Sequence, residues 1–292
     1  MEPAELRRHR ERGRYDVASI RAVFSDCFMA HVSYVDGGLP QCLPIFALFR
    51  CEDEGEAVYL HGHPSSRLME LVRANEVKRK ARIERGELGH GDGDEDEDED
   101  ERIKVCITAT KVDGLSLSSA PNGHTFNYRS AVVHGACSRV EGRNTKLDVM
   151  RGVMDHIVPG RWDGLNPLAS IALSLVFVIR VQVQRGSLKL NSGVPMIQPR
   201  DRAKDGPDRA EPVWTGVVPL HEQLGQPVPS GLTDGAEIPE RLLKYIRERN
   251  EREEGYAKSV YCLDVCSCEA MEPQCQTAES FAFDSQEDVS VV

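Results

Sequence analysis

The alternation of apolar and polar positions predicts a chain built mainly from short strands. Residues 28–35, 103–112 and 131–140 alternate in this way, and we expect each to form a strand. Asp36-Gly37-Gly38 predicts a tight hairpin turn after the first strand. Residues 39–49 are its expected partner, and Pro40 and Pro44 favour an edge or a bulge over a central position. With a third strand near 58–60, these segments predict an antiparallel meander.

Helical spacing appears in only a few places. Asp16 is a plausible N-cap for a helix ending near Cys27, and a second helix is expected from Arg67 to about Ala74. Thr145 with Asp148 resembles a capping box for a helix that Pro159-Gly160 ends. A short turn at 168–173, strands at 175–183 and 187–191, and a last helix at 239–249 complete the pattern.

Residues 57–74 combine strand, turn and helix in a way that favours anion binding. Val58, Tyr59 and Leu60 lead into the polar turn 61–66, and Arg67 opens the helix. Unpaired backbone N–H groups at a helix start attract phosphate. The sequence therefore predicts a phosphate site here, although an ordinary N-cap with a surface arginine would give the same pattern.

Composition divides the 292 residues, 40% of them hydrophobic, into one domain with polar extensions. We expect a flexible basic arm at 1–13, a folded domain at 14–250 and a disordered tail at 251–292. The acidic run 92–101 indicates a disordered insertion at about 86–102, because dense like charges repel and nothing apolar is present to bury. Neither this run nor the tail cysteines have the spacing of a calcium or zinc site, so no metal is predicted.

Charge and hydropathy exclude several classes of partner. A net charge of -11 argues against nucleic acid and anionic membranes, which require excess Lys and Arg. The longest apolar run, 168–179, is too short to span a bilayer. The N-terminus lacks the apolar core of a signal peptide, so we expect a cytoplasmic protein with reduced thiols.

Several short motifs, in order along residues 14–220, carry a family resemblance. The motifs are His31-Val32, Asp36-Gly37, Pro40, Pro44-Ile45, Tyr59-Leu60-His61-Gly62, Ser65-Ser66-Arg67, Asn127-Tyr128-Arg129-Ser130, Gly135, Pro159-Gly160-Arg161-Trp162 and residues 214–219. With these motifs the chain resembles the pyridoxamine 5′-phosphate oxidase-like FMN-binding flavoproteins, in particular the branch that includes nitroimidazole-resistance proteins. The resemblance implies a mainly β fold with peripheral helices, a six-stranded antiparallel split β-barrel, and a homodimer that binds FMN in two interface grooves.

Candidate cofactor contacts follow from the residue types and from this resemblance. The hydroxyls of Ser65 and Ser66 and the guanidinium of Arg67 suit the FMN phosphate. By analogy with the family, Pro44, Ile45 and Phe46 would flank the flavin ring, although plain core is an equal interpretation.

Four further residues complete this set of candidates. Arg129 and Ser130 would lie near the cofactor and the dimer contact, where Arg129 could equally form an intersubunit ion pair. His61 is the candidate ring or substrate contact, with His63 and His124 as weaker ones. Trp214 could stack over a ligand or only anchor its own segment.

The leading functional hypothesis is an FMN-dependent oxidoreductase that acts on a small organic substrate. The sequence has neither the G-x-S-x-G elbow of a serine hydrolase nor the G-x-G-x-x-G fingerprint of a dinucleotide site. A non-catalytic carrier of flavin or haem is the second hypothesis, and a scaffold that recruits partners through the acidic insertion and the tail is the third.

Overall fold

Strands form most of the ordered chain, joined by a small number of helices. The computed structural model describes residues 1–87, 101–197, 213–233 and 235–260, within one unit spanning Met1–Tyr261. Most of the acidic insertion and residues 261–292 of the expected tail lie outside the described residues, so the predictions made for them stay predictions.

The strands belong to one mixed but mostly antiparallel sheet with the order β4-β3-β7-β8-β9-β6-β5. Three short strands attach to its sides, β1 and β2 to β9, and β10 to β7. The sheet does not close among the described strands, as expected of a split barrel. The strands are β1 Glu2–Pro3, β2 Gly13–Arg14, β3 Ala30–Asp36, β4 Leu39–Ile45, β5 Ala47–Glu52, β6 Gly55–Gly62, β7 Lys104–Leu117, β8 Thr125–Arg139, β9 Phe177–Asn191 and β10 Gly216–Pro219.

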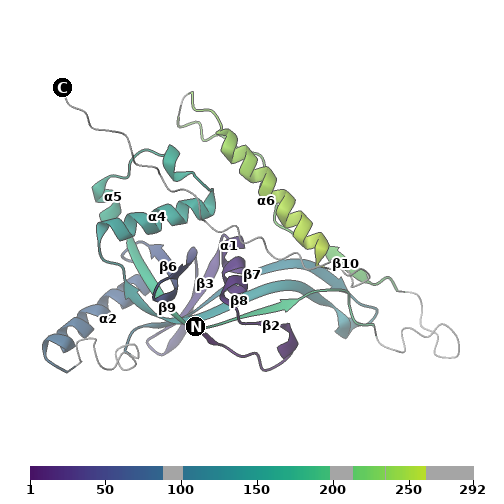
Figure 1. Cartoon of the computed structure of the whole chain (residues 1–292), viewed down its shortest axis with the longest axis horizontal. Helices are drawn as coiled ribbons and strands as arrows, with labels where there is room; N and C mark the ends of the chain where they lie inside the picture. The colour runs from purple at the N-terminus through teal and green to yellow at the C-terminus, as the bar shows by residue number, and fades with distance from the viewer. Residues whose placement is uncertain (88–100, 198–212, 234, 261–292) are drawn as a thin grey trace. The chain divides into compact units, whose positions relative to one another are not determined.

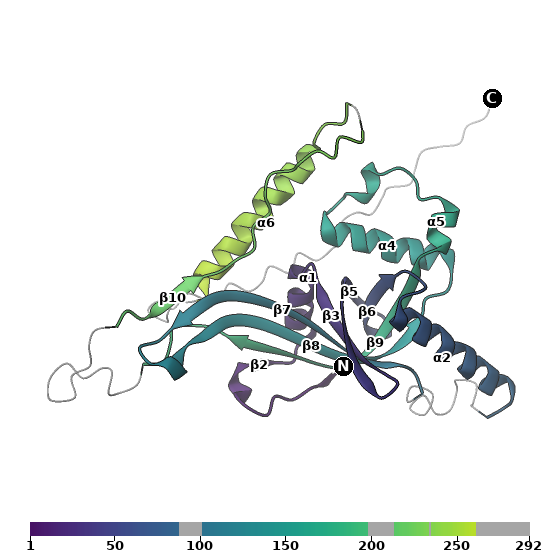
Figure 2. The same cartoon turned by 180° about the vertical axis from the view of Figure 1, so that it is seen from behind.

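Helices cover the curved sheet and its ends (Figures 1 and 2). They are α1 Val17–Asp26, α2 Arg67–Glu84, α4 Arg143–Ile157, α5 Ser170–Ser174 and α6 Glu240–Ser259, with 3-10 turns at Arg10–Arg12, Pro121–Gly123 and Trp162–Gly164. Both views show α1 within the curve of the sheet and α4 beside α5. No helix in the described part of the chain is long and apolar enough to cross a membrane.

The predicted three-strand meander is wrong. The segment 39–49 is two strands that separate at Phe46, so β3 pairs with β4 and β5 pairs with β6 in two different hairpins. These hairpins lie at opposite edges of the sheet, because β3 continues onto β7 while β6 continues onto β9. The edge position expected for Pro40 and Pro44 is confirmed, since both lie on the edge strand β4.

Two clusters of buried side chains lie on opposite faces of β6 and β9. The larger cluster includes Leu60 and Ile179 of the sheet, Phe24 of α1 and Leu68 of α2. The smaller cluster includes Tyr59, Val178 and the α4 residues Val149 and Val153. Because neighbouring strand residues point to opposite faces, α2 and α4 cover different sides of the same strands.

Several boundaries differ from the sequence-based expectations; among them, α2 ends at Glu84 and not near Ala74. Helix α4 begins at Arg143 after the N-cap Gly142, so Thr145 lies inside the helix and is not its cap; the φ of +91° at Gly142 suits glycine. Helix α6 continues to Ser259 because Glu253 and Ala257 are buried on its inner face. The first residues, expected as a flexible arm, contribute β1 and β2, which pair with β9.

Candidate functional site

The turn between β6 and α2 leaves two buried polar atoms without partners. His61 Nδ1 and Ser66 Oγ are both enclosed and have no hydrogen-bond partner in the protein. The turn is otherwise held by its backbone, since Ser66 N donates to His63 O at 2.9 Å and Glu70 N donates to Ser66 O at 3.0 Å. Although Ser66 is the N-cap residue of α2, its side chain makes no cap hydrogen bond. Since buried polar groups are normally paired, these atoms mark a place where a ligand could bind.

Arg67, the predicted phosphate ligand, is engaged by a carboxylate of another hairpin. Its Nε and Nη2 atoms donate to the two carboxylate oxygens of Asp36 at 2.6 and 2.7 Å. The hydrogen bonds from Arg67 hold the pKa of Asp36 below its usual value. The guanidinium is therefore oriented at the start of α2, with a carboxylate in the bidentate position that a phosphate could also take.

His61 lies in a row of three rings that reaches α4. The ring of Phe46 contacts His61 edge-on, with centroids 6.1 Å apart, and contacts His156 at 4.6 Å and 84°. Burial lowers the pKa of both histidines below the ordinary 6.5, and at His156 the hydrogen bond from Nε2 to Cys27 O, 2.9 Å long, partly offsets it. Both imidazoles are therefore neutral at neutral pH, which leaves His61 able to donate or accept one hydrogen bond.

The two residues before Phe46 have different environments. Pro44 is exposed on β4 opposite His31, whereas Ile45 is 9% exposed and belongs to the larger core cluster. Ser65 is exposed, and its backbone N–H donates to His63 Nδ1 at 3.2 Å. The structure thus brings Phe46 to His61. Arg67 instead binds Asp36 at the turn end of the β3–β4 hairpin, whereas Pro44 and Ile45 lie at the other end of β4.

Arg129, Ser130 and Trp214 lie toward the opposite end of the sheet. His61 is opposite Val178 on β9 while Arg129 is opposite Leu190, which corresponds to about 40 Å of strand. Trp214, 66% exposed, lies close to Gly216 at the start of β10. One chain therefore does not assemble all the predicted contacts in a single site.

Arg129 already has strong partners within the chain. It is buried, donates to both carboxylate oxygens of Asp113 at 2.9 and 3.1 Å and to Asp26 at 2.6 Å, and stacks on Tyr256. Burial opposes its charge, but these acidic partners, Asp113 first, raise its pKa overall. Its observed role is an ion pair that links β8 to β7, α1 and α6, while Ser130 Oγ shares a hydrogen bond with Thr110 Oγ.

Asp36 and His156 carry no sequence signal that would select them for this site. Asp36 belongs to a predicted turn, and only the hairpin geometry places its carboxylate against Arg67. His156 follows the apolar stripe of α4 and shows no motif of its own.

The weaker candidate His124 bonds through Nδ1 to Ala120 O at 3.1 Å and is a local turn contact. Across the described ranges, no group of three or more His, Cys, Asp or Glu residues is arranged to hold a metal.

The middle of the chain matches a known protein family. The family model described as pyridoxamine 5′-phosphate oxidase matches residues 89–190, which include β7, β8, α4 and most of β9. The resemblance to the pyridoxamine 5′-phosphate oxidase-like family is confirmed. The matched stretch contains Arg129 and Ser130 but ends before Trp214 and begins after the turn 61–67. No curated protein matches this chain significantly.

Solved structures show the same fold at low sequence identity. The flavocytochrome Anf3 from Azotobacter vinelandii is 24% identical with a TM-score of 0.63, covering 84% of this chain and 99% of that one. An FAD and heme binding protein from Mycobacterium smegmatis is 22% identical with a TM-score of 0.62, covering 80% and 97%. A candidate 5-nitroimidazole resistance protein from Bacteroides thetaiotaomicron, at 19% identity and a TM-score of 0.42 over 61% and 86%, is too distant to carry an argument.

Proposed function

We propose that this chain is a flavoprotein that holds a flavin phosphate at the turn between β6 and α2. The observation that carries the proposal is that His61 Nδ1 and Ser66 Oγ, in the segment that leads into α2, are buried and have no hydrogen-bond partner, while Asp36 orients the guanidinium of Arg67 at the start of that helix. The pyridoxamine 5′-phosphate oxidase-like fold and the flavin-binding proteins among its structural neighbours support the same cofactor class.

The residues present fit a phosphorylated flavin. Ser66 Oγ can donate to a phosphate oxygen, Arg67 can rotate from Asp36 to a bidentate contact, and the start of α2 adds a favourable dipole. His61 would contact the flavin or the substrate as a neutral imidazole, and Phe46 would contribute apolar surface. FMN, expected from the sequence, satisfies these contacts, and FAD presents the same riboflavin phosphate.

The proposed activity is oxidation or reduction of a small organic substrate. A bound flavin supplies the redox chemistry, while the protein binds it and sets its electrostatic surroundings. His61 is the proposed polar contact beside the ring because its pKa is lowered by burial and its Nδ1 has no partner within the protein.

We further propose that the protein is a homodimer. Phe126 and Val218 both lie opposite Leu115 on neighbouring strands and are 55% and 43% exposed, so an apolar surface lies at the end of the sheet far from His61. An interface there would cover this surface and place the Trp214 segment near a second subunit. Sedimentation equilibrium tests this assembly; a monomer at all accessible concentrations contradicts it.

Haem in addition to flavin is the second candidate. Two solved structures are matched over 99% and 97% of their own length by this chain. They are described as a flavocytochrome and as an FAD and heme binding protein. Neutral imidazole is a common haem ligand, and His61 is the described histidine with a buried, unpartnered ring nitrogen. A pyridine haemochrome assay of the purified protein tests this candidate.

Analysis of the cofactor released by denaturation tests the main proposal. We expect a phosphorylated flavin in the extract of the purified protein and a lower flavin content in Ser66→Ala. Ser259→Ala at the end of α6 is the matched control, because its hydroxyl donates only to Tyr256 O. A colourless protein that binds neither FMN nor FAD on reconstitution would refute the proposal.

A further inference from the structure

The two ends of the acidic insertion are held by one arginine of α2. Arg82 donates to the carboxylate of Glu101 at the end of the insertion, and its Nε lies 3.4 Å from Oε2 of Glu87 at the start. Asn75 Nδ2 also donates to the backbone O of Glu101 at 2.8 Å. Residues 88–100, which lie outside the described residues, therefore leave α2 and return to it at the same place. An extended chain spans about 3.3 Å per residue, so their midpoint can reach about 20 Å from these ends.

A basic surface begins beside these ends and continues to the start of α4. Lys80 lies less than one helical turn before Arg82, and its Nζ is 3.0 Å from the carboxylate of Glu141, between β8 and α4. The pKa of Glu141 is below its usual value, first because of the hydrogen bond from Lys80, and the charges of Arg139 and Lys146 lower it further. Three cations therefore act on one carboxylate, and the base of the insertion is one ion pair away from α4.

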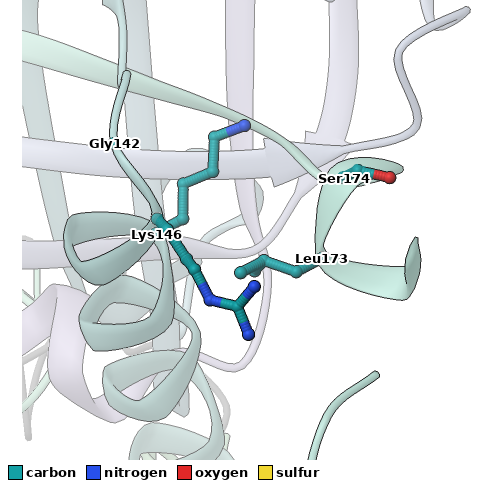
Figure 3. A pocket seen from close by; sticks show the side chains of 5 residues that line it. Gly142, Lys146, Leu173 and Ser174 are labelled. Atoms are coloured by element: carbon teal, nitrogen blue, oxygen red, sulfur yellow. The ribbon is translucent and has the colours of Figure 1, made fainter. Parts of the chain in front are cut away.

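This basic surface contains a cavity at the start of α4 (Figure 3). The cavity has a volume of about 270 Å³ and is lined by Gly142, Arg143, Lys146, Leu173 and Ser174. The figure shows Lys146 of α4 on one side and Leu173 and Ser174 of α5 on the other. Lys146 Nζ donates to Val176 O at 3.3 Å, a neutral acceptor, and an ammonium group carries three donors. The first turn of α4 contains no acidic residue, so the cavity suits an anion.

The described residues and the insertion have opposite charge. The whole chain has a net charge of -11, but Lys and Arg outnumber Asp and Glu among the described residues. Within the acidic run, every residue from Asp92 to Asp100 except Gly93 is acidic. Like charges at this density repel one another, and a basic surface within reach lowers the electrostatic energy of such a run.

We propose that the acidic run 92–100 docks, within its own chain, on the basic surface formed by Lys80, Arg139, Arg143 and Lys146, with carboxylates in the cavity at the start of α4. The position of the two ends of the insertion, its length and its charge carry this inference, which does not depend on flavin binding. The contact neutralises the basic surface, and it keeps other polyanions away from the cavity.

Carbodiimide cross-linking of the full chain, read by mass spectrometry, tests this contact because the reagent joins a carboxylate directly to an amine. We expect Lys146 and Lys80 to be linked to carboxylates of residues 92–100 at low ionic strength, and about fivefold less at about 1 M salt, where exposed charges are screened. Lys244 is the matched control, since it is an exposed lysine of α6 that lies 3.7 Å from Glu248 and should not be linked to the run. A mixture of unlabelled and nitrogen-15-labelled protein shows whether the linked residues belong to one chain.

A charge-neutralised variant tests the same contact without cross-linking. Asp→Asn and Glu→Gln throughout residues 94–100 preserve the length of the insertion and both of its ends. Lys146 should react with an amine-acetylating reagent about fivefold faster in this variant than in the parent, whereas Lys244 should react equally in both. Unchanged reactivity of Lys146, or links from the run to other lysines only, would overturn the inference. Links between two chains only would also overturn it, and would indicate an interface between copies instead.

Discussion

Arg67 and Asp36 form a bidentate ion pair that joins the start of α2 to the β3–β4 hairpin, with N–O distances of 2.6 and 2.7 Å. The two side chains are 57% and 22% exposed, so water screens the pair and its contribution to folding is small. A carboxylate in the position proposed for a phosphate makes Asp36 both an orienting group and a competitor.

Substitution of either partner should therefore affect flavin affinity in opposite directions. Asp36→Asn frees Arg67, and we expect it to tighten flavin binding, whereas Arg67→Ala should weaken binding roughly tenfold through the lost contact with phosphate. Fluorescence titration measures both. Glu70→Gln, whose carboxylate lies 3.7 Å from Arg67, is the control for a general change in local charge. Weaker binding in Asp36→Asn would show that Asp36 only positions the arginine.

The buried His61 should make the protein less stable in acid. The unfolded chain takes up a proton near pH 6.5, whereas burial keeps the folded imidazole neutral to lower pH. Below pH 6.5 the unfolded state thus binds more protons, and the free energy of unfolding falls as pH decreases, by up to about 1.4 kcal/mol for each unit of pKa difference. Urea unfolding of flavin-free protein from about pH 8 to about pH 5 should show a shallower acid slope in His61→Gln. An unchanged slope would mean that His61 titrates alike in both states.

The buried pair Lys111 and Glu253 should be strongly coupled. Their side chains are 5% and 4% exposed, with Nζ and Oε2 3.0 Å apart, and they connect β7 to α6. Lys111→Met or Glu253→Gln alone should cost about 3–5 kcal/mol, because each leaves a buried charge with fewer partners. The double variant should cost less than the sum in a urea-unfolding cycle. Lys258→Met, from an exposed pair with Glu254, should change stability by less than about 0.5 kcal/mol.

Replacement of glycine by alanine should have opposite effects on stability at Gly135 and at Gly255. A Cβ at Gly135 would lie 2.1 Å from the backbone oxygen of Gln182, beside the bulge between β8 and β9. Gly135→Ala should therefore destabilise the sheet by about 1–3 kcal/mol or more. Gly255 is exposed within α6, and a Cβ there would meet open space, so Gly255→Ala should stabilise the helix by up to about 1 kcal/mol. Thermal unfolding distinguishes the two, and equal shifts would contradict the packing argument.

The local pattern of this chain determined most of its elements. Asp16 caps α1 by accepting from Ser19 N at 2.8 Å, Gly37 and Gly38 form the turn after β3, and Arg67 begins α2, all as expected. These features depend on residues within a few positions of one another, and backbone preference and capping are readable at that range. The resemblance to the pyridoxamine 5′-phosphate oxidase-like family, and with it the split barrel, followed from ordered motifs of the same short range.

Tertiary structure alone decided which distant residues meet. The strands β4 and β5 are adjacent in sequence but lie at opposite edges of the sheet, because their partners β3 and β6 pair with β7 and β9 far along the chain. The same pairing sets Asp36 against Arg67 and His156 against Phe46, and it separates Arg129 from His61. Sheet register and helix packing depend on contacts between residues far apart in the sequence and on the burial of whole faces. The local sequence therefore identified the turn 61–67, whereas the fold determined which residues surround it.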